Sequence, residues 1–193
     1  MNKLHIGIVG AGRIGNVHAE SITYHIPEAE VVMVTDVIEA SAKKLAERFG
    51  IPKYSADYMD IINDPAIDAV LVCSPTPTHA DITIAALKAG KHVFCEKPVH
   101  TSIEKIQEVA KVAEETGKKL QIGFNRRFDH NHKAVQKLVK DGCLGNVEII
   151  KITSRDPEPP FLAALTRRRL WRKGETHGEK RKRRRICRRT ADR

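Results

Sequence analysis

A glycine-rich loop near the start of the chain has the residue types that bind phosphate groups. It consists of Gly10-Ala11-Gly12-Arg13-Ile14-Gly15, follows the apolar run Leu4–Val9 directly, and opens a segment with helical periodicity. Gly10 permits a tight turn, Gly12 lets backbone N–H groups approach a pyrophosphate, and Gly15 lets the helix pack closely on the strand. Because the helix N-terminus adds partial positive charge, residues 10–15 are predicted to bind a nicotinamide dinucleotide.

An acidic residue, Asp36, stands 21 residues after Gly15, at the end of the second predicted strand. At about this spacing an acid accepts hydrogen bonds from the hydroxyls of the adenosine ribose, and its carboxylate repels a 2′-phosphate. The sequence therefore favours NAD over NADP. Two alternatives stay open, because Asp36 could only cap the following helix and Arg13 could attract the 2′-phosphate of NADP.

A second loop with hydrogen-bonding side chains follows the apolar run Ala69–Cys73. It consists of Ser74-Pro75-Thr76-Pro77-Thr78-His79, and its two prolines stiffen it. Loops at the carboxyl ends of strands form the ligand sites of open α/β folds. We therefore expect Ser74, Thr76 and His79 to contact the cofactor. The alternative is a rigid turn in which Thr78 caps the next helix, and both can hold together.

A lysine well placed for chemistry follows the next predicted strand, in the sequence Cys95-Glu96-Lys97-Pro98. Beside a nicotinamide ring, Lys97 could hydrogen-bond a substrate hydroxyl and stabilise the alkoxide that develops as hydride leaves, or assist deprotonation of that hydroxyl. Glu96 could orient or tune Lys97 through its charge, and we place it among the cofactor contacts. Alternatively, Glu96 and Lys97 form an ion pair that brackets the loop.

These loops come together only if a parallel sheet positions them, and the apolar pattern predicts one. Strand-length apolar runs alternate with segments of helical period over residues 1–124. The predicted strands are Leu4–Val9, Val31–Thr35, Ala69–Cys73, His92–Cys95 and Leu120–Phe124, and the predicted helices span residues 12–24, 39–49, 79–89 and 103–116. Strands that are apolar throughout and separated by helices indicate an α/β fold of the Rossmann type, a doubly wound parallel sheet covered on both faces.

The pattern changes after residue 124. A helix to about Lys140 is predicted next, and Val147–Thr153 alternates like a strand, so we interpret residues 125–160 as a linker helix and the first strand of an incomplete α+β substrate domain. Residues 161–193 contain 14 Lys and Arg against three acidic residues, with no sustained period. Such a segment buries too little apolar surface to offset its ordering entropy, so we predict a disordered basic tail.

The formal net charge of +10 belongs to that tail, because residues 1–160 contain 20 basic and 21 acidic residues. The net charge is therefore a weak indication of nucleic-acid binding by the body of the protein. Four widely separated cysteines, Cys73, Cys95, Cys143 and Cys187, predict neither a metal site nor a disulfide framework and fit a reducing compartment. With no leader peptide and no run of ~18 apolar residues, we expect a cytoplasmic protein without a membrane partner.

The order and spacing of these motifs resemble those of the Gfo/Idh/MocA oxidoreductases. The resemblance covers residues 4 to about 160 and rests on the glycine loop, residues 74–79, Glu96-Lys97-Pro98 and residues 123–129. Within that family, residues 125–129 and 154–157 are most similar to the inositol 2-dehydrogenases. The resemblance implies NAD-dependent oxidation of a polyol hydroxyl to a ketone. It also implies that Lys97 is catalytic and contacts the substrate, with Asn125 near the cofactor and Arg126 near the substrate.

The sequence departs from the family pattern after Pro160. The family would continue with the sheet that binds substrate and builds the oligomer, and with an Asp-x-x-x-His helix whose histidine is the expected proton acceptor. Beyond residue 160 the chain has one Asp, Asp192, and one His, His177, in the opposite order. This favours a reading-frame change near codon 160, and hence a truncated oxidoreductase with little or no activity and no family oligomer. The alternative is a nucleotide-binding module with a natural basic arm that binds nucleic acid.

Overall fold

The structure, a computed structural model, describes residues 3–153. The chain divides into two units, residues 1–143 and 144–193. The predicted tail over residues 161–193, with Asp192 and His177, and the family-like residues 154–157 lie outside the described part.

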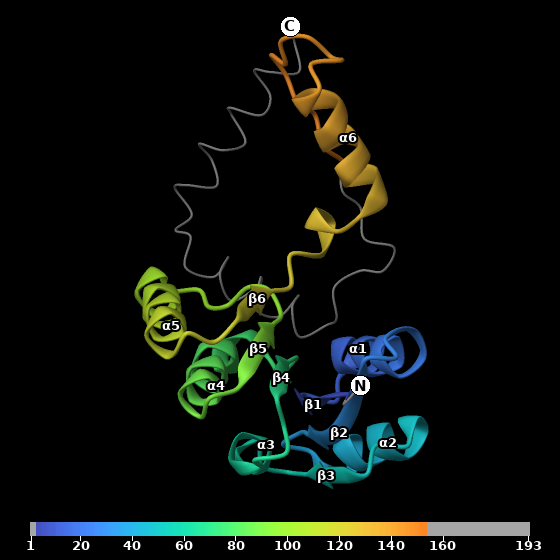
Figure 1. The fold of residues 1–193 in the computed structure, drawn as a ribbon, viewed down its shortest axis with the longest axis vertical. Coiled ribbons are helices and arrows are strands. Elements are labelled where there is room, and N and C mark those ends of the chain that lie inside the picture. Colours follow the sequence, from blue (N-terminus) through green and yellow to red (C-terminus); the bar gives the residue numbers. More distant parts are fainter. Residues whose placement is uncertain (1–2, 154–193) are drawn as a thin grey trace, which may run out of the picture. The chain divides into compact units, whose positions relative to one another are not determined.

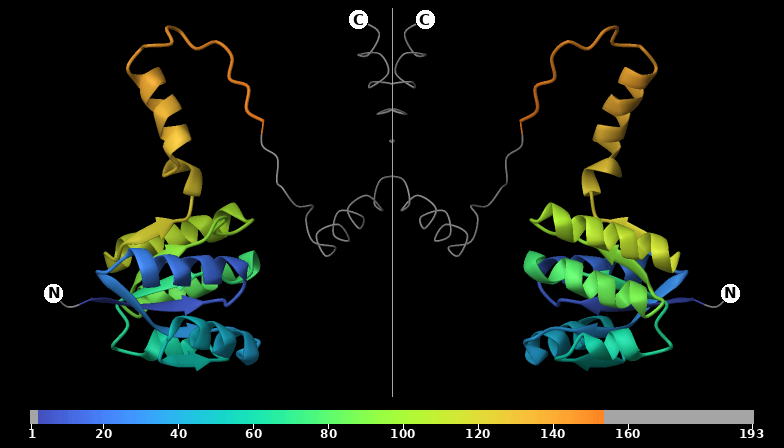
Figure 2. Two further views of the ribbon diagram at one scale, coloured as in Figure 1. Left: turned by 90° about the vertical axis from the view of Figure 1, so that its right-hand side faces the viewer. Right: turned by 90° about the vertical axis from the view of Figure 1, so that its left-hand side faces the viewer.

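A six-stranded parallel sheet forms the centre of the first unit (Figure 1). Its strands are β1 (Leu4–Val9), β2 (Ala29–Thr35), β3 (Lys53–Ser55), β4 (Ala69–Val72), β5 (His92–Cys95) and β6 (Leu120–Ile122). Their order in the sheet is β3-β2-β1-β4-β5-β6, so β3 and β6 lie at opposite edges (Figure 2). The direction of winding reverses between β1 and β4, which is the point where dinucleotides bind in this topology.

Helices cover both faces of the sheet, as the doubly wound prediction requires. They are α1 (Arg13–His25), α2 (Glu39–Phe49), α3 (Met59–Asn63), α4 (Thr76–Lys88) and α5 (Ile103–Thr116). A 3-10 turn η1 (Asn125–Arg127) and helix α6 (His130–Lys140) follow β6, and α6 has no buried residue. In Figure 1, α1 and α2 lie on one side of the sheet and α4 and α5 on the other. The Rossmann-type fold class is confirmed.

Two apolar cores follow from the alternation of side chains along the buried strands. Val70 and Val72 of β4 belong to the core under α4 and α5. Ala69 and Leu71, between them in sequence, belong to the core under α1 and α2. Because both faces of the sheet are buried, the strands are apolar throughout rather than alternating, which is why they could be recognised in the sequence.

The structure differs from the sequence analysis in several local features. Residues 147–153 are not a strand, since the described part of the second unit has no regular secondary structure. Ile149 is 87% exposed there and Ile150 is 74% exposed, so no neighbouring strand pairs with this segment in the described residues, and an unpaired strand is not stable. The alternative in which Thr78 caps the next helix does not describe the structure either. Helix α4 already begins at Thr76 after Pro75, and the Thr78 hydroxyl donates a hydrogen bond to the Pro75 carbonyl (2.8 Å). Two short elements, β3 and α3, have three and five residues and were not predicted.

No helix within residues 3–153 is both long and apolar enough to cross a membrane. In the same residues, no group of three or more His, Cys, Asp and Glu side chains could hold a metal ion.

Candidate functional site

Five loops meet at the carboxyl edge of the sheet because the strands that precede them are parallel. They follow β1, β2, β4, β5 and β6, and they contain nearly all the predicted site residues.

The glycine loop after β1 leaves open space where a phosphate would bind. Gly10 has a φ of +105°, and a Cβ there would lie 2.7 Å from the backbone of Cys73 and Ser74. A Cβ on Gly15 would lie 2.0 Å from the carbonyl oxygen of Gly10. Around Gly12, in contrast, a Cβ would meet nothing within 4 Å. Gly10 and Gly15 therefore permit close packing, and Gly12 leaves room for a ligand, which fits the phosphates of a dinucleotide.

The Asp36 carboxylate is held against this loop. Its Oδ2 accepts a hydrogen bond from the backbone N–H of Ala11 (2.8 Å), and its Oδ1 accepts one from the N–H of Ile38 (2.9 Å). Helix α2 begins at Glu39 without a side-chain cap, so the helix-cap alternative for Asp36 does not describe the structure. The carboxylate is instead fixed between the phosphate loop and the end of β2, where a ribose hydroxyl would bind.

A largely apolar cavity of about 550 Å³ adjoins Asp36. Its walls come from the ends of β1, β2 and β4 and from α4, and the lining residues are Val9, Gly10, Thr35, Asp36, Val37, Ile38, Ala56, Tyr58, Ser74, Pro75, Thr78, Asp81 and Ile82. Apolar walls with few polar groups suit an adenine ring and its ribose. Of the predicted contacts after β4, Ser74 lines this cavity, while Thr76 and His79 do not.

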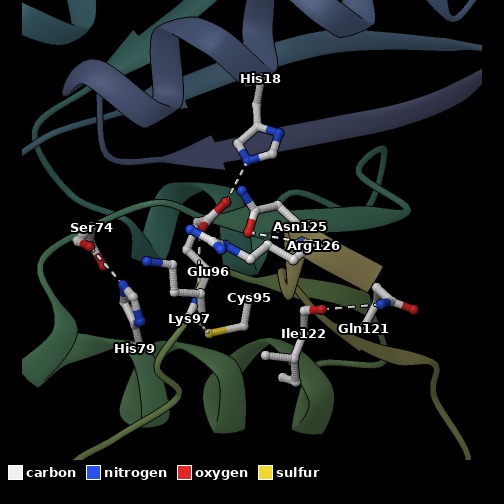
Figure 3. A network of polar contacts seen from close by, with 10 residues as sticks. All are labelled: His18, Ser74, His79, Cys95, Glu96, Lys97, Gln121, Ile122, Asn125 and Arg126. Atoms are coloured by element: carbon white, nitrogen blue, oxygen red, sulfur yellow. Dashed lines mark hydrogen bonds and ion pairs between the residues drawn. The ribbon is translucent and has the colours of Figure 1, made fainter. Parts of the chain in front are cut away.

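His79 connects two loops. It is only 2% exposed, its Nδ1 lies 2.8 Å from the Pro98 carbonyl oxygen, and its Nε2 lies 2.6 Å from the Ser74 carbonyl oxygen. Both ring nitrogens are thus engaged by backbone groups, as Figure 3 shows for the Ser74 contact. His79 therefore links the loops after β4 and β5. Its contact with the cofactor stays a prediction.

Glu96 pairs with a histidine that the sequence analysis missed. His18 of α1 reaches the Glu96 carboxylate, with 2.8 Å between Nε2 and Oε1 (Figure 3). The His18 ring also packs edge-on against Phe94, with 5.2 Å between ring centroids. A Cβ on Gly123 would lie 3.2 Å from the Glu96 carboxylate, so the absence of a side chain there makes room for it. The signal for His18 was its position three residues after Gly15, on the same helix face.

Lys97 forms no ion pair with Glu96 within residues 3–153, so the ion-pair alternative is not what the structure shows. Only its backbone N–H lies near the Glu96 carboxylate, at 3.3 Å. Its side chain lines a cavity of about 430 Å³ together with Phe124, Asn125, Arg126 and Arg127. The structure therefore brings Lys97, Asn125 and Arg126 together in one cavity, with Phe124 and Arg127 beside them.

Two thiols at the ends of β4 and β5 are buried beside this edge. Burial, followed by the charge of Glu96, raises the pKa of the Cys73 thiol to about 12. Burial likewise raises the pKa of the Cys95 thiol to about 11. Both groups stay protonated at neutral pH, which makes them poor nucleophiles.

A parallel sheet of this order, with a glycine loop at its switch point and an acid after β2, defines a dinucleotide-binding Rossmann domain. Residues 4–124 match the Gfo/Idh/MocA family, described as an oxidoreductase family with an NAD-binding Rossmann fold, and the chain belongs to that family.

The chain is similar in sequence to inositol dehydrogenases. It is 42% identical to myo-inositol 2-dehydrogenase of Thermotoga maritima over 82% of this chain and 47% of the relative. It is 43% identical to inositol 2-dehydrogenase of Rhizobium meliloti over 81% of this chain and 47% of the relative. The chain thus spans about half the length of the curated relatives that it matches.

Solved structures show the same likeness. Scyllo-inositol dehydrogenase from Lactobacillus casei, solved with NAD(H) and scyllo-inositol, superimposes with a TM-score of 0.72 at 36% identity, over 75% of this chain and 43% of that one. Myo-inositol 2-dehydrogenase from Lactobacillus plantarum has a TM-score of 0.73 at 31% identity, over 76% and 43% of the two chains.

Proposed function

We propose that the chain binds NAD at the carboxyl edge of its sheet and that its chemistry is oxidation of a polyol CH–OH group of the inositol type. The observation that carries this proposal is the cavity shared by Lys97, Asn125 and Arg126, since it stands at the edge that also holds the glycine loop. The similarity to inositol 2-dehydrogenases supports the substrate class.

In this proposal each group along the edge has a separate task. The Asp36 carboxylate accepts hydrogen bonds from the hydroxyls of the adenosine ribose, and residues 10–15 hold the pyrophosphate. Bound NAD supplies the hydride acceptor. The Lys97 ammonium donates a hydrogen bond to the reacting hydroxyl oxygen and stabilises the negative charge that develops on it. Asn125 contacts the cofactor and Arg126 contacts the polyol.

The domain boundaries and the level of activity belong to the same proposal. Residues 1–124 form the NAD-binding domain, and residues 125–160 lead into a substrate domain. Within residues 3–153 no Asp-x-x-x-His sequence supplies the proton acceptor that the family resemblance implies. We therefore expect firm cofactor binding and weak or undetectable turnover.

Titration with NAD and NADH, together with an assay of NADH formation from myo-inositol and scyllo-inositol, tests the proposal. We expect saturable NAD binding that is tighter than NADP binding. Lys97→Met should leave NAD affinity within about twofold and abolish any measurable turnover. Lys111→Met, on the outer face of α5, serves as a matched control that changes neither. Failure to bind NAD, or tighter binding of NADP, would refute the proposed cofactor site.

A second candidate is a nucleotide-binding module that also binds nucleic acid, and the 14 basic residues of segment 161–193 support it. Basic clusters bind phosphate backbones in a salt-dependent way. RNA binding that weakens steeply with salt and disappears on deletion of residues 161–193 would favour this candidate, and its absence at low salt would exclude it.

A further inference from the structure

A separate cavity lies between the first turn of α1 and helix α2, and the proposed chemistry does not use it. Its volume is about 350 Å³. The lining residues are Ala11, Gly12, Arg13, Asn16, Ser41, Lys44, Leu45 and Arg48. Three of them, Ala11, Gly12 and Arg13, belong to the glycine loop, so this α1–α2 pocket shares one wall with the dinucleotide site.

The α1–α2 pocket is strongly positive. Arg13, Lys44 and Arg48 line it, and none of its described lining residues is acidic. Within residues 3–153, neither Arg13 nor Lys44 forms an ion pair. The nearby acid of α2, Glu47, pairs with Lys43 instead, at 3.9 Å. Three cations around one cavity without a counter-charge repel one another, and an anion between them would relieve that repulsion.

Hydrogen bonds fix one of these cations beside the glycine loop. The Asn16 side-chain amide donates to the carbonyl oxygens of Ala11 and Gly12, each at 3.0 Å, and its Oδ1 accepts from the Arg48 guanidinium at 3.2 Å. The guanidinium also lies 4.8 Å from the centroid of the Phe49 ring. Arg48 is therefore positioned in advance, and less ordering entropy is lost when it binds a ligand.

We propose that the α1–α2 pocket binds a phosphate group. Phosphate presents acceptor oxygens in several directions, and a planar guanidinium together with a flexible ammonium can bind two of its edges at once. The Ser41 side chain adds a further polar group to the wall of the pocket. The phosphate has two chemical sources. It is either the 2′-phosphate of NADP, extending past Asp36 from the adenosine ribose, or the phosphate of a separate molecule that binds beside NAD.

Titration of the full chain with inorganic phosphate at constant ionic strength, with chloride as the reference, tests the shared chemistry. We expect Lys44→Glu and Arg48→Glu each to weaken phosphate binding by about tenfold or more, which is the loss of one charge-assisted hydrogen bond. Lys43→Glu is the matched control, because Lys43 is adjacent in the same helix but does not line the pocket. It should change phosphate affinity less than about threefold, the weak effect of an exposed charge.

No phosphate response beyond that of chloride would overturn the proposal, as would equal losses in Lys43→Glu and Lys44→Glu. If Lys44→Glu does not fold, Lys44→Gln removes the same charge without adding a negative one. Neither measurement requires turnover, so the α1–α2 pocket can fail this test while the proposed NAD site stands.

A second titration distinguishes the two sources. If the phosphate is that of NADP, NADP should displace inorganic phosphate. Lys44→Glu should then weaken NADP binding without changing the affinity for NAD. If it belongs to a separate molecule, phosphate and NADP should bind together, and Lys44→Glu should leave the affinities of both cofactors unchanged.

Discussion

At the scale of single residues, the carboxylate of Asp36 has two functions, and Asp36→Ala removes both. It accepts hydrogen bonds from the backbone N–H groups of Ala11 and Ile38, and in our proposal it also accepts hydrogen bonds from the ribose hydroxyls. Asp36→Ala should weaken NAD binding by about tenfold or more. The same change should shift the ratio of NADP to NAD affinity toward NADP, because a negative charge near the 2′ position is removed.

Asp68→Ala is the control for Asp36→Ala. Asp68 accepts a backbone hydrogen bond from the N–H of His5 (2.9 Å), before the start of β4 and so away from the carboxyl edge. Asp68→Ala should lower the free energy of unfolding about as much as Asp36→Ala does, and it should leave the affinities for NAD and NADP unchanged. An unchanged NADP to NAD ratio in Asp36→Ala would contradict the ribose assignment.

A second prediction at this scale concerns His18. The Glu96 side chain is only 15% exposed and has His18 as its side-chain partner. His18→Leu should leave that carboxylate poorly satisfied and lower the free energy of unfolding by about 1–3 kcal/mol in chemical denaturation. The exposed pair of His132 and Asp129 offers a contrast, since both side chains there are over 40% exposed. His132→Leu should lower it much less, because solvent screens an exposed pair, and similar losses in the two variants would show that burial of Glu96 is unimportant.

At the scale of elements, substitution of two glycines of one loop by alanine should have different effects, one on stability and the other on cofactor binding. A Cβ on Gly15 would collide with the Gly10 carbonyl at 2.0 Å, which would push α1 away from β1. Gly15→Ala should therefore lower the free energy of unfolding by about 2–3 kcal/mol. A Cβ on Gly12 would meet nothing within 4 Å, so Gly12→Ala should change stability little. It should nevertheless weaken NADH binding, measured by fluorescence titration. Equal stability losses in the two variants would contradict this packing argument.

Acid sensitivity can be assigned to the link between β3 and the end of α3. A hydrogen bond from Lys53 (2.8 Å), and then one from the N–H of Ala66, lower the pKa of Asp64 below its ordinary value of 3.8. Protonation of Asp64 therefore favours the unfolded chain. The ionised Asp64 carboxylate stabilises the folded chain by about 1 kcal/mol, a small amount because its partner Lys53 is exposed. This stabilisation is complete above the ordinary pKa and is lost as the pH falls through the lowered pKa. Asp64→Asn should remove that part of the pH dependence in denaturation curves between pH 5 and pH 2, and identical curves would contradict it.

The same elements show what the sequence could predict. The strands β1, β4 and β5 are buried on both faces, so their apolar runs were visible and their bounds nearly correct. Strand β3 has only three residues, of which Lys53 and Tyr54 are exposed, and no apolar run marks it. For residues 147–153 the error was the opposite one, since a strand was predicted where none forms. Alternation predicts a strand only where a partner strand is present. Similarly, the types of Glu96 and His79 marked them as site residues, whereas their partners His18 and Pro98 depend on the tertiary fold.

At the scale of the whole molecule, ligand binding should appear as stability. A ligand that binds only the folded chain raises the free energy of unfolding, by about 2.7 kcal/mol when its concentration is 100 times its Kd. NAD should produce such a shift in thermal unfolding, and it should be reduced in Gly12→Ala, because the pyrophosphate needs the open space beside Gly12. A chain that binds NAD without any gain in stability would indicate that the unfolded state binds it equally well.

Phosphate extends this argument, because two independent sites contribute separately to stability. If the α1–α2 pocket binds a molecule other than the cofactor, the stabilisation by inorganic phosphate should add in full to that by NAD and also to that by NADP. If the pocket binds the 2′-phosphate, saturating NADP should abolish the phosphate increment while NAD leaves it intact. Thermal unfolding with each combination, repeated in Lys44→Glu, measures the increment directly. An increment that persists undiminished in Lys44→Glu would place the phosphate outside the α1–α2 pocket.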